Sequence, residues 1–248
     1  MDLGFWSFLF LTFGIQLIHY CSLCTVFTIY DLNPENHALS RYKIQETKNT
    51  PVKYDDILVC ILQALINQCF VTLPSIAFSY FLFLYRGSNL DYTTFPSLSR
   101  FILDLASFLI VEEILFYHFH RLMHTSFFYS RIHKRHHQFT APISLSALYS
   151  HPIEHALINL LPVLSGPILM ASHIWTTWIW VVLVMTNAIL VHSGYHLPFL
   201  ISTRLHDFHH AQFNSNFGVL GVLDYLYGTD VDFRKSKEYE KDKILLHF

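Results

Sequence analysis

Long apolar stretches alternate with polar ones along this chain of 248 residues. Five apolar stretches stand out for their length: residues 5–30, 57–85, 101–119, 156–171 and 175–191. A helix needs about 20 apolar residues to cross a hydrocarbon core of about 30 Å. The first three stretches meet this length, whereas the last two are short and predict either tilted spans or a re-entrant pair. The pattern therefore predicts an all-α, integral membrane helical bundle, with a kink at Pro74 in the second stretch.

The charges between these stretches predict which ends of the helices share a side of the membrane. Basic residues gather after the first and third stretches: Arg41, Lys43, Lys48 and Lys53, then Arg121, Arg131, Lys134 and Arg135. The loop over 86–99 holds only Arg86. Loops rich in lysine and arginine stay in the cytosol, and with that assignment the crossings alternate without conflict. Every histidine-rich polar segment then lies on the cytosolic side, as a helical cap on the bundle.

Three regions follow from this organisation. Residues 1–100 hold the N-terminal spans and their loops, and residues 101–230 hold the histidine-rich part. Residues 231–248 are charged, and we expect them to form a solvated cytosolic tail.

The composition agrees with a membrane protein and adds one unusual feature. Hydrophobic residues make up 52% of the chain and charged residues 14%, whereas charged residues are about a quarter of an ordinary soluble domain. The net charge of −2 gives no electrostatic reason to expect nucleic acid as a partner. Histidine is the exception, because its 17 copies outnumber the 16 lysines and arginines.

Ten of these histidines fall into four clusters, two with HxxxH and two with HxxHH spacing. They are His120, His124, His133, His136, His137, His192, His196, His206, His209 and His210. On a helix, positions i and i+4 share one face, so an HxxxH pair can grip one ion. Adjacent histidines in HxxHH diverge by about 100°, so one such cluster can serve two neighbouring ions. Ten imidazoles suit two borderline metal ions with four or five nitrogen ligands each.

The clusters and their surroundings resemble the fatty acid hydroxylase superfamily of membrane di-iron proteins over about residues 104–230. Three further segments carry the resemblance: the helix end from Glu113 to His124, the segment Tyr149-Ser-His-Pro-Ile-Glu154, and Leu223-Asp-Tyr-Leu-Tyr-Gly-Thr229. Lys43-Ile-Gln45 and Ala141-Pro142 are most similar to the sterol desaturase and C-4 methylsterol oxidase branch.

This resemblance implies an enzyme in which all ten histidines hold two iron ions and O2 is the co-substrate. It implies hydroxylation or desaturation of a lipid C–H bond, of a sterol first and of a fatty acyl chain second, in the endoplasmic reticulum membrane. The printed sequence contains no His-Pro-Gly-Gly haem motif. The electrons would therefore come from a separate donor such as cytochrome b5 or its reductase.

Three acidic residues are candidates for a supporting catalytic role. Glu113 shares a helix face with His120 and His124, and we expect it to accept the N–H of a ligand histidine, the alternative being a simple buried pair. Glu154 and Asp207 could play the same part, or could be a helix N-terminal charge and a solvated side chain.

Four other residues near the clusters are expected to stand apart from the metals. Glu112 is predicted to be interfacial, and His118 to face away from its neighbour His120. His151 and His155 form a third HxxxH pair, but Pro152 between them indicates a loop entering a helix.

Two other classes of protein stay open at this point. Imidazole binds zinc as well as iron, so a hydrolytic or structural di-zinc membrane protein fits the same clusters. A metal transporter or another membrane protein without enzymatic activity is the second alternative. Transport would need ionisable residues along the spans, whereas here they gather at one end.

Overall fold

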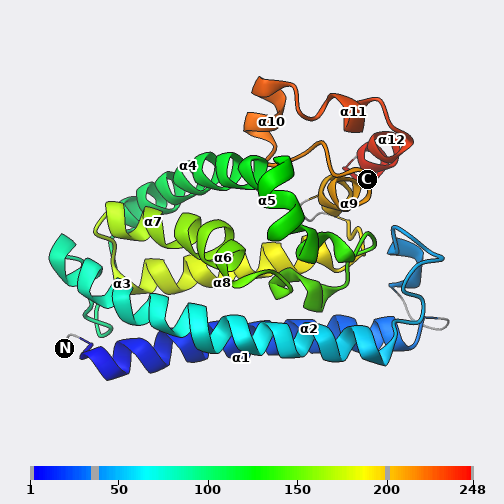
Figure 1. Cartoon of the computed structure of the whole chain (residues 1–248). Helices are drawn as coiled ribbons and strands as arrows, with labels where there is room; N and C mark the ends of the chain where they lie inside the picture. The colour runs from blue at the N-terminus through cyan, green and yellow to red at the C-terminus, as the bar shows by residue number, and fades with distance from the viewer. Residues whose placement is uncertain (1–2, 35–38, 199–201, 247–248) are drawn as a thin grey trace.

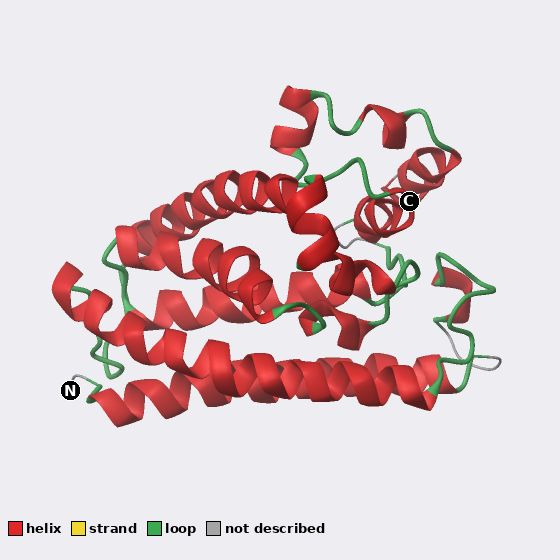
Figure 2. Ribbon diagram, in the orientation of Figure 1, coloured by secondary structure: helices red, strands yellow, loops and turns green. Residues whose placement is uncertain are grey.

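The protein folds into an all-helical bundle in this computed structural model, which describes residues 3–34, 39–198 and 202–246 (Figure 2). The longer helices are α1 (Phe5–Leu32), α2 (Tyr54–Asn67), α3 (Leu73–Arg86), α4 (Leu98–Met123), α7 (Leu161–Leu169), α8 (Ile174–His192), α9 (Thr203–Gln212) and α12 (Lys237–Leu246). The shorter ones are α5 (Ser126–Arg131), α6 (Pro152–Glu154), α10 (Val222–Tyr227) and α11 (Val231–Arg234). Short 3-10 helices are also present: η1 (Ser40–Tyr42), η3 (His133–Gln138) and η4 (Ser144–Leu148). No strand occurs in the described ranges, as the sequence predicts.

Four helical stretches are long and apolar enough to cross a membrane: α1, the continuous Tyr54–Arg86, Pro152–Leu169, and α8. Their outward faces carry exposed large apolar side chains, such as Trp6, Phe10 and Ile18 of α1. Such a continuous apolar surface suits lipid rather than water. The prediction of an integral membrane helical bundle is confirmed. The third predicted stretch lies in α4, which is not among the four and carries three buried acids, Asp104, Glu112 and Glu113.

Hydrogen bonds at one end of the bundle show that the helices alternate in direction. The backbone N–H of Leu3, just before α1, donates to Leu90 O at 3.1 Å, and that of Ile174 at the start of α8 donates to Asn89 O at 2.9 Å. Arg86 at the end of α3 donates to Leu169 O at the end of α7 at 2.8 Å. Starts of some helices thus meet the ends of others, and α1, α4 and α8 all end at the opposite side of the bundle (Figure 1).

Two π-helical turns, η2 (Gln68–Thr72) and η5 (His155–Leu160), interrupt the long spans side by side. The Thr72 hydroxyl lies 2.8 Å from His155 Nε2 and joins the two turns. η2 comes directly before Pro74 at the start of α3, so the irregularity predicted at that proline is a π-bulge. Such bulges insert an extra residue and recur near functional sites.

The loops that follow α1 and α8 are fastened together at the histidine-bearing end. Ile44 N donates to Gly194 O at 2.9 Å, and His196 N donates to Tyr42 O at 2.8 Å. Lys43 Nζ lies 2.6 Å from Asp31 Oδ1. The segment after the first span therefore forms part of the wall around the histidines.

The charged C-terminal region, which the sequence predicts to be a solvated tail, also contacts the histidine-bearing part of the protein. Within it, α12 packs on α9, where Ser202 donates to Asp242 at 2.6 Å and Arg204 pairs with Glu238 at 2.5 Å. Asp242 is buried. The charges of this region thus serve contacts with the histidine-bearing α9 as well as with solvent.

Replacing Gly166 in α7 by Ala should destabilise the bundle. A Cβ at this position would lie 2.9 Å from the Cα of Phe108 on α4, where backbone cannot move aside easily. Overpacking of this kind costs about 1–3 kcal/mol, so the midpoint of thermal unfolding in detergent should fall. Gly14→Ala is the matched control, because no atom lies within 4 Å of its Cβ. Equal midpoints for both variants would contradict the close α4–α7 contact.

Candidate metal centre

Histidines from four separate elements converge at the end of the bundle in two groups. The first group has five members, His120, His124, His133, His137 and His209, and the second has four, His136, His192, His206 and His210. Within each group one ring nitrogen of every histidine lies within 4.8 Å of the others. The structure thus brings together side chains of α4, η3, α8 and α9, with His124 capping α4.

The HxxHH clusters divide between the two groups as their spacing predicts. His137 belongs to the first group and its neighbour His136 to the second. In the other cluster His209 belongs to the first group and His210 to the second. Because adjacent residues on a helical turn point in different directions, each cluster contributes to both groups and holds them next to each other.

Backbone carbonyls fix the tautomer of four of these rings. Nδ1 lies 2.8 Å from Phe217 O in His120 and 2.6 Å from Ser215 O in His209. In His136 it lies 3.2 Å from Tyr149 O, and in His192 2.7 Å from Ala188 O. A carbonyl only accepts hydrogen bonds, so Nδ1 carries the proton in each of these rings. In the neutral ring the Nε2 atom is then left as a bare lone pair.

These unprotonated nitrogens face one another. The distance between them shows whether they could bind the same metal ion. His192 Nε2 lies 3.2 Å from His136 Nε2. Two lone pairs at this distance repel, since neither ring has a proton to share. A cation between them removes the repulsion. Metal–nitrogen bonds of about 2.1 Å at right angles place neighbouring nitrogens roughly 3.0 Å apart, so the separation fits two ligands of one ion.

Burial keeps the rings in the form that a metal needs. Burial lowers the pKa of His136 to about 4, so the ring is neutral at physiological pH. Burial also drives the pKa of His209 and His210 well below the usual value. Metal ligands must be deprotonated, and here the interior of the protein has already favoured that state.

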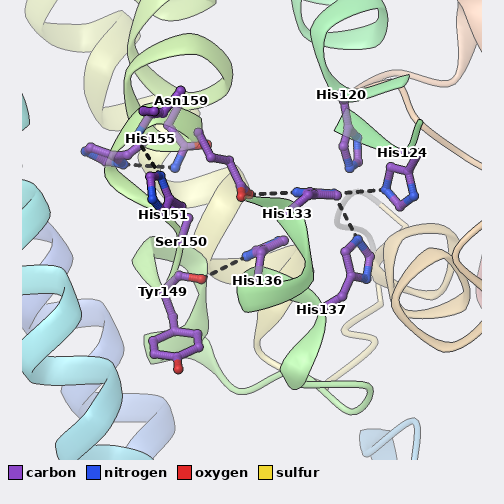
Figure 3. Close-up of polar contacts among 12 residues, drawn as sticks. His120, His124, His133, His136, His137, Tyr149, Ser150, His151, His155 and Asn159 are labelled. Atoms are coloured by element: carbon purple, nitrogen blue, oxygen red, sulfur yellow. Dashed lines mark hydrogen bonds and ion pairs between the residues drawn. The ribbon is translucent and has the colours of Figure 1, made fainter. Parts of the chain in front are cut away.

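Glu154 lies against one of the converging rings. Its Oε1 atom is 2.9 Å from His133 Nδ1, while His133 Nε2 lies 2.9 Å from His124 Nε2 (Figure 3). Both Glu154 and His133 are buried. A carboxylate beside the far nitrogen of a ligand histidine orients the ring. Glu154 therefore stands where a supporting carboxylate is expected.

The sequence predicts that Glu113 accepts the N–H of a ligand histidine, but its carboxylate contacts backbone N–H groups instead. Its Oε2 atom accepts the N–H groups of Val219 and Leu220 at 2.9 and 2.8 Å, and Oε1 accepts that of Leu223 at 3.0 Å. The His120 ring is held by Phe217 O instead. Glu113 therefore acts on His120 indirectly, through the loop that supplies this carbonyl. The distant loop outcompetes a histidine on the same helix because it presents several unpaired N–H groups at once.

Asp224 supports the same loop, and no local sequence spacing points to it. Its carboxylate accepts the N–H groups of Phe217 and Gly218, each at 2.7 Å, and the Thr229 hydroxyl at 2.6 Å. A side chain at Gly218 would lie 2.8 Å from Asp224 and 2.9 Å from Glu113. The only signal in the sequence is its place in the closing motif, Leu223-Asp-Tyr-Leu-Tyr-Gly-Thr229.

His196 lies outside both groups, contrary to the prediction that it is a ligand. Its Nδ1 atom is 3.2 Å from the Thr203 hydroxyl and its Nε2 atom 3.4 Å from Asp242 Oδ1. The reason is local: α8 ends at His192, and Gly194 turns the chain with a φ of +75°. The HxxxH spacing places two rings on one face only where the helix continues.

Asp207 contacts residues around the histidine groups rather than the histidines themselves. Gln45 Nε2 donates to its two oxygens at 3.1 and 3.0 Å and lies 2.9 Å from Thr140 O as well. Burial raises the pKa of Asp207 to about 6. Among the described residues no histidine ring bonds to this carboxylate, so it positions α9 and does not touch the groups directly.

Three histidines that the sequence sets apart from the metals lie outside both groups. His118 is exposed and bonds to Ile114 O at 2.7 Å on its own helix. His151 caps the turn at Ile153 N, and His155 bonds to Thr72 and Asn159 away from the two groups (Figure 3).

A cavity leads from the histidines into the bundle. It reaches both groups, through His120, His133, His136, His192 and His206. Most of its lining is apolar, from α4, η5, α7 and α8, with Phe116, Ile158, Val163, Val181 and Met185 among the lining residues. Glu112 lines it too, which corrects the prediction of an interfacial side chain. An apolar group could thus approach both groups of rings from within the bundle.

A family model described as "Fatty acid hydroxylase" matches residues 105–229, which contain the histidines of both groups. The chain is 42% identical over 234 residues to "Fatty acid hydroxylase domain-containing protein 2" of Homo sapiens, covering 94% of this chain and 70% of that protein. This chain belongs to the fatty acid hydroxylase family.

Two further relatives are named for different lipid-modifying activities. The chain is 34% identical to "Fatty acid hydroxylase ahd1" of Mycosarcoma maydis, over 88% of this chain and 57% of that protein. It is 30% identical to "Methylsterol monooxygenase 2-2" of Arabidopsis thaliana, over 82% and 79%. No solved structure matches the chain. These relatives are named for lipid-modifying enzymes, so membership supports an oxidoreductase without selecting the lipid.

The metal content of histidine variants should show which histidines bind metal ions. We expect about two ions per purified chain by elemental analysis, and fewer in His136→Ala and His209→Ala, because each change removes one member of a converging group. His118→Ala is the control on the same helix as His120. His196→Ala should keep the full metal content. A loss with His196→Ala as large as with His209→Ala would restore the ligand role that the sequence predicts.

Glu113→Gln should lower stability although it preserves shape. The amide replaces one accepting oxygen by an N–H2 group, which then faces backbone N–H donors. A buried donor left without an acceptor costs about 1–3 kcal/mol, so the unfolding midpoint should fall. Weaker metal retention should accompany it, because the 217–223 loop holds His120. Exposed Asp232→Asn is the control. An unchanged midpoint would show that the loop does not depend on Glu113.

Proposed function

We propose that this protein is a membrane-bound non-haem di-iron oxygenase that hydroxylates or desaturates a C–H bond of a lipid, using O2 and external electrons. The observation that carries the proposal is the pair of histidine groups that meet at the head of a largely apolar cavity. Imidazole nitrogens alone make up both groups, and this donor type suits iron and leaves it free to change oxidation state. The family to which the chain belongs supports the same class of reaction.

When bound, two iron ions supply the reduction of O2 and the oxidation of the C–H bond, which no side chain here can perform. The protein itself would contribute placement. Phe217 O and Ser215 O hold the rings of His120 and His209, and Glu154 lies against His133. The cavity would align one C–H bond with the centre and exclude bulk water, which is the part that proteins play in cofactor chemistry.

The overall stoichiometry explains why a partner is needed. Hydroxylation consumes one O2, two electrons and two protons, and yields one hydroxylated lipid and one water. We propose a separate electron donor such as cytochrome b5 or its reductase. We also propose that the histidine end faces the cytosol from the endoplasmic reticulum membrane, because the basic loops with Arg41, Lys48 and Arg131 lie at that end and such loops stay cytosolic. Among substrates we expect a sterol first and a fatty acyl chain second.

Turnover by the iron-loaded chain should add oxygen to, or remove hydrogen from, a membrane lipid. Microsomes that contain the full chain are incubated with an electron donor, 18O2 and separate sterol and acyl-lipid pools. Mass spectrometry should find a product carrying one labelled oxygen, or one lighter by two hydrogens. His136→Ala and His209→Ala should abolish it, since each breaks one histidine group, whereas His118→Ala should keep it.

The same experiment tests the alternatives. A chain that purifies with zinc and turns over without O2 would support a di-zinc protein instead. A chain whose lipid products match those of His209→Ala in every pool would contradict the oxygenase proposal.

A further inference from the structure

A carboxyl group in the cavity stands out because the protein gives it no partner. Glu112 lies in the middle of α4, its side chain is 4% exposed, and it lines the cavity with Phe116 and His120. Among the described residues no hydrogen bond or ion pair reaches its oxygens. Its neighbour Glu113, by contrast, accepts three backbone N–H groups.

Burying a carboxyl group without a partner costs free energy whether or not it is ionised. Proteins retain such groups where they have a function, and within a membrane such residues mark substrate or ion pathways. An additional metal ion does not explain Glu112, because Glu113 has both oxygens engaged and Glu112 belongs to neither converging group. The missing partner is therefore a molecule that enters the cavity.

A second unpartnered acceptor lines the same cavity from another helix. Asn187 of α8 lines the same cavity, and its Oδ1 atom is buried with no hydrogen-bond partner. α4 and α8 both run toward the histidine end (Figure 1). Asn187 comes five residues before His192, and Glu112 eight before His120. The two acceptors thus stand on different helices, both on the side of the histidine groups from which the cavity extends into the bundle.

The chemistry of the two groups indicates which ligand they receive. A carboxylate only accepts hydrogen bonds, and a protonated carboxyl both donates and accepts. An alcohol can satisfy either form, and its single donor suits the Asn187 carbonyl oxygen as well. The surrounding lining, such as Ile158 and Met185, is apolar. This combination suits a lipid that carries a hydroxyl group.

We infer that Glu112, assisted by Asn187, binds a hydroxyl group of the lipid substrate and so positions that substrate in the cavity. The inference rests on the proposed function and narrows its substrate to hydroxyl-bearing lipids. Glu112 is a positioning residue, since it lies away from both histidine groups.

The depth of Glu112 also constrains where the lipid reacts. Eight residues separate it from His120, which is about 12 Å along the axis of α4 at 1.5 Å per residue. A carbon directly beside the anchored hydroxyl would stop well short of the histidines. The geometry therefore favours oxidation at a carbon remote from the hydroxyl over a methyl group on the adjacent carbon.

The test measures binding, so that it does not depend on turnover. The full iron-loaded chain is placed in phosphatidylcholine nanodiscs, and two matched pairs compete for it: cholesterol with its 3-O-methyl ether, and octadecan-1-ol with its methyl ether. Each ether keeps the oxygen and loses the donor. We expect the wild type to prefer the alcohol of at least one pair by about tenfold or more, as for a hydrogen bond to a charged or buried acceptor.

Three variants identify the groups responsible. Glu112→Leu should abolish the preference, Glu112→Gln should retain part of it through its carbonyl oxygen, and Asn187→Leu should weaken it. Met185→Leu is the matched control, because Met185 lines the same wall of the cavity and carries no donor or acceptor. It should keep the wild-type preference.

Stability provides an independent readout. If Glu112 has no partner within the protein, Glu112→Leu should unfold at the same temperature as the wild type or higher, because it removes a buried unpaired group. A clear fall in the midpoint would show that Glu112 is structural and would overturn the inference. Equal affinities for alcohol and ether in both pairs, or tighter binding of octadecylamine than of octadecan-1-ol, would overturn it too. Oxygenase activity without an alcohol preference refutes only this inference, whereas an alcohol preference without O2 chemistry refutes only the proposed function.

Discussion

The mutual repulsion of unprotonated imidazoles governs the histidine end of this protein. His136 and His192 each have Nδ1 against a backbone carbonyl, so their Nε2 lone pairs meet at 3.2 Å with no proton between them. His206 adds a third nitrogen 3.0 Å from that of His192. A cation among these nitrogens would supply the attraction that the His136 and His192 rings lack. Much of the surrounding structure serves to keep the carbonyls and rings in this arrangement.

The supports come from segments far apart in the sequence. Glu113 of α4 and Asp224 of α10 share the 217–223 loop, and this loop presents the carbonyl that orients His120. On the other side, Gln45 ties the segment after α1 to Asp207, next to His206. Each of these contacts turns an acid inward, where it would be costly unpaired. The acids near the histidine groups thus help to orient the rings, and most of them do so by binding backbone N–H groups.

The long helices and the division of neighbouring histidines between two groups could be predicted from the sequence. Apolar stretches predict the long helices, and the angle between adjacent helical residues predicts that His136 and His137 separate into different groups. His196 shows the limit, because the i+4 rule assumes a helix that Gly194 ends. Glu113 shows a second limit. Its helix face points correctly toward the loop and His120, but which partner it takes depends on N–H groups about a hundred residues later, and local spacing carries no information about them.

The cavity adds a conflict between stability and function that the fold has to tolerate. Nine converging imidazoles and the unpartnered Glu112 and Asn187 are all unfavourable in an apolar interior until something binds them. The π-helical turns η2 and η5 lie beside this region, and Thr72 and His155 within them line the cavity. Ligands would offset the cost of these groups: a pair of cations at the histidine groups and a polar lipid further into the cavity. Because such ligands bind the folded state alone, they would add to the stability of the loaded protein.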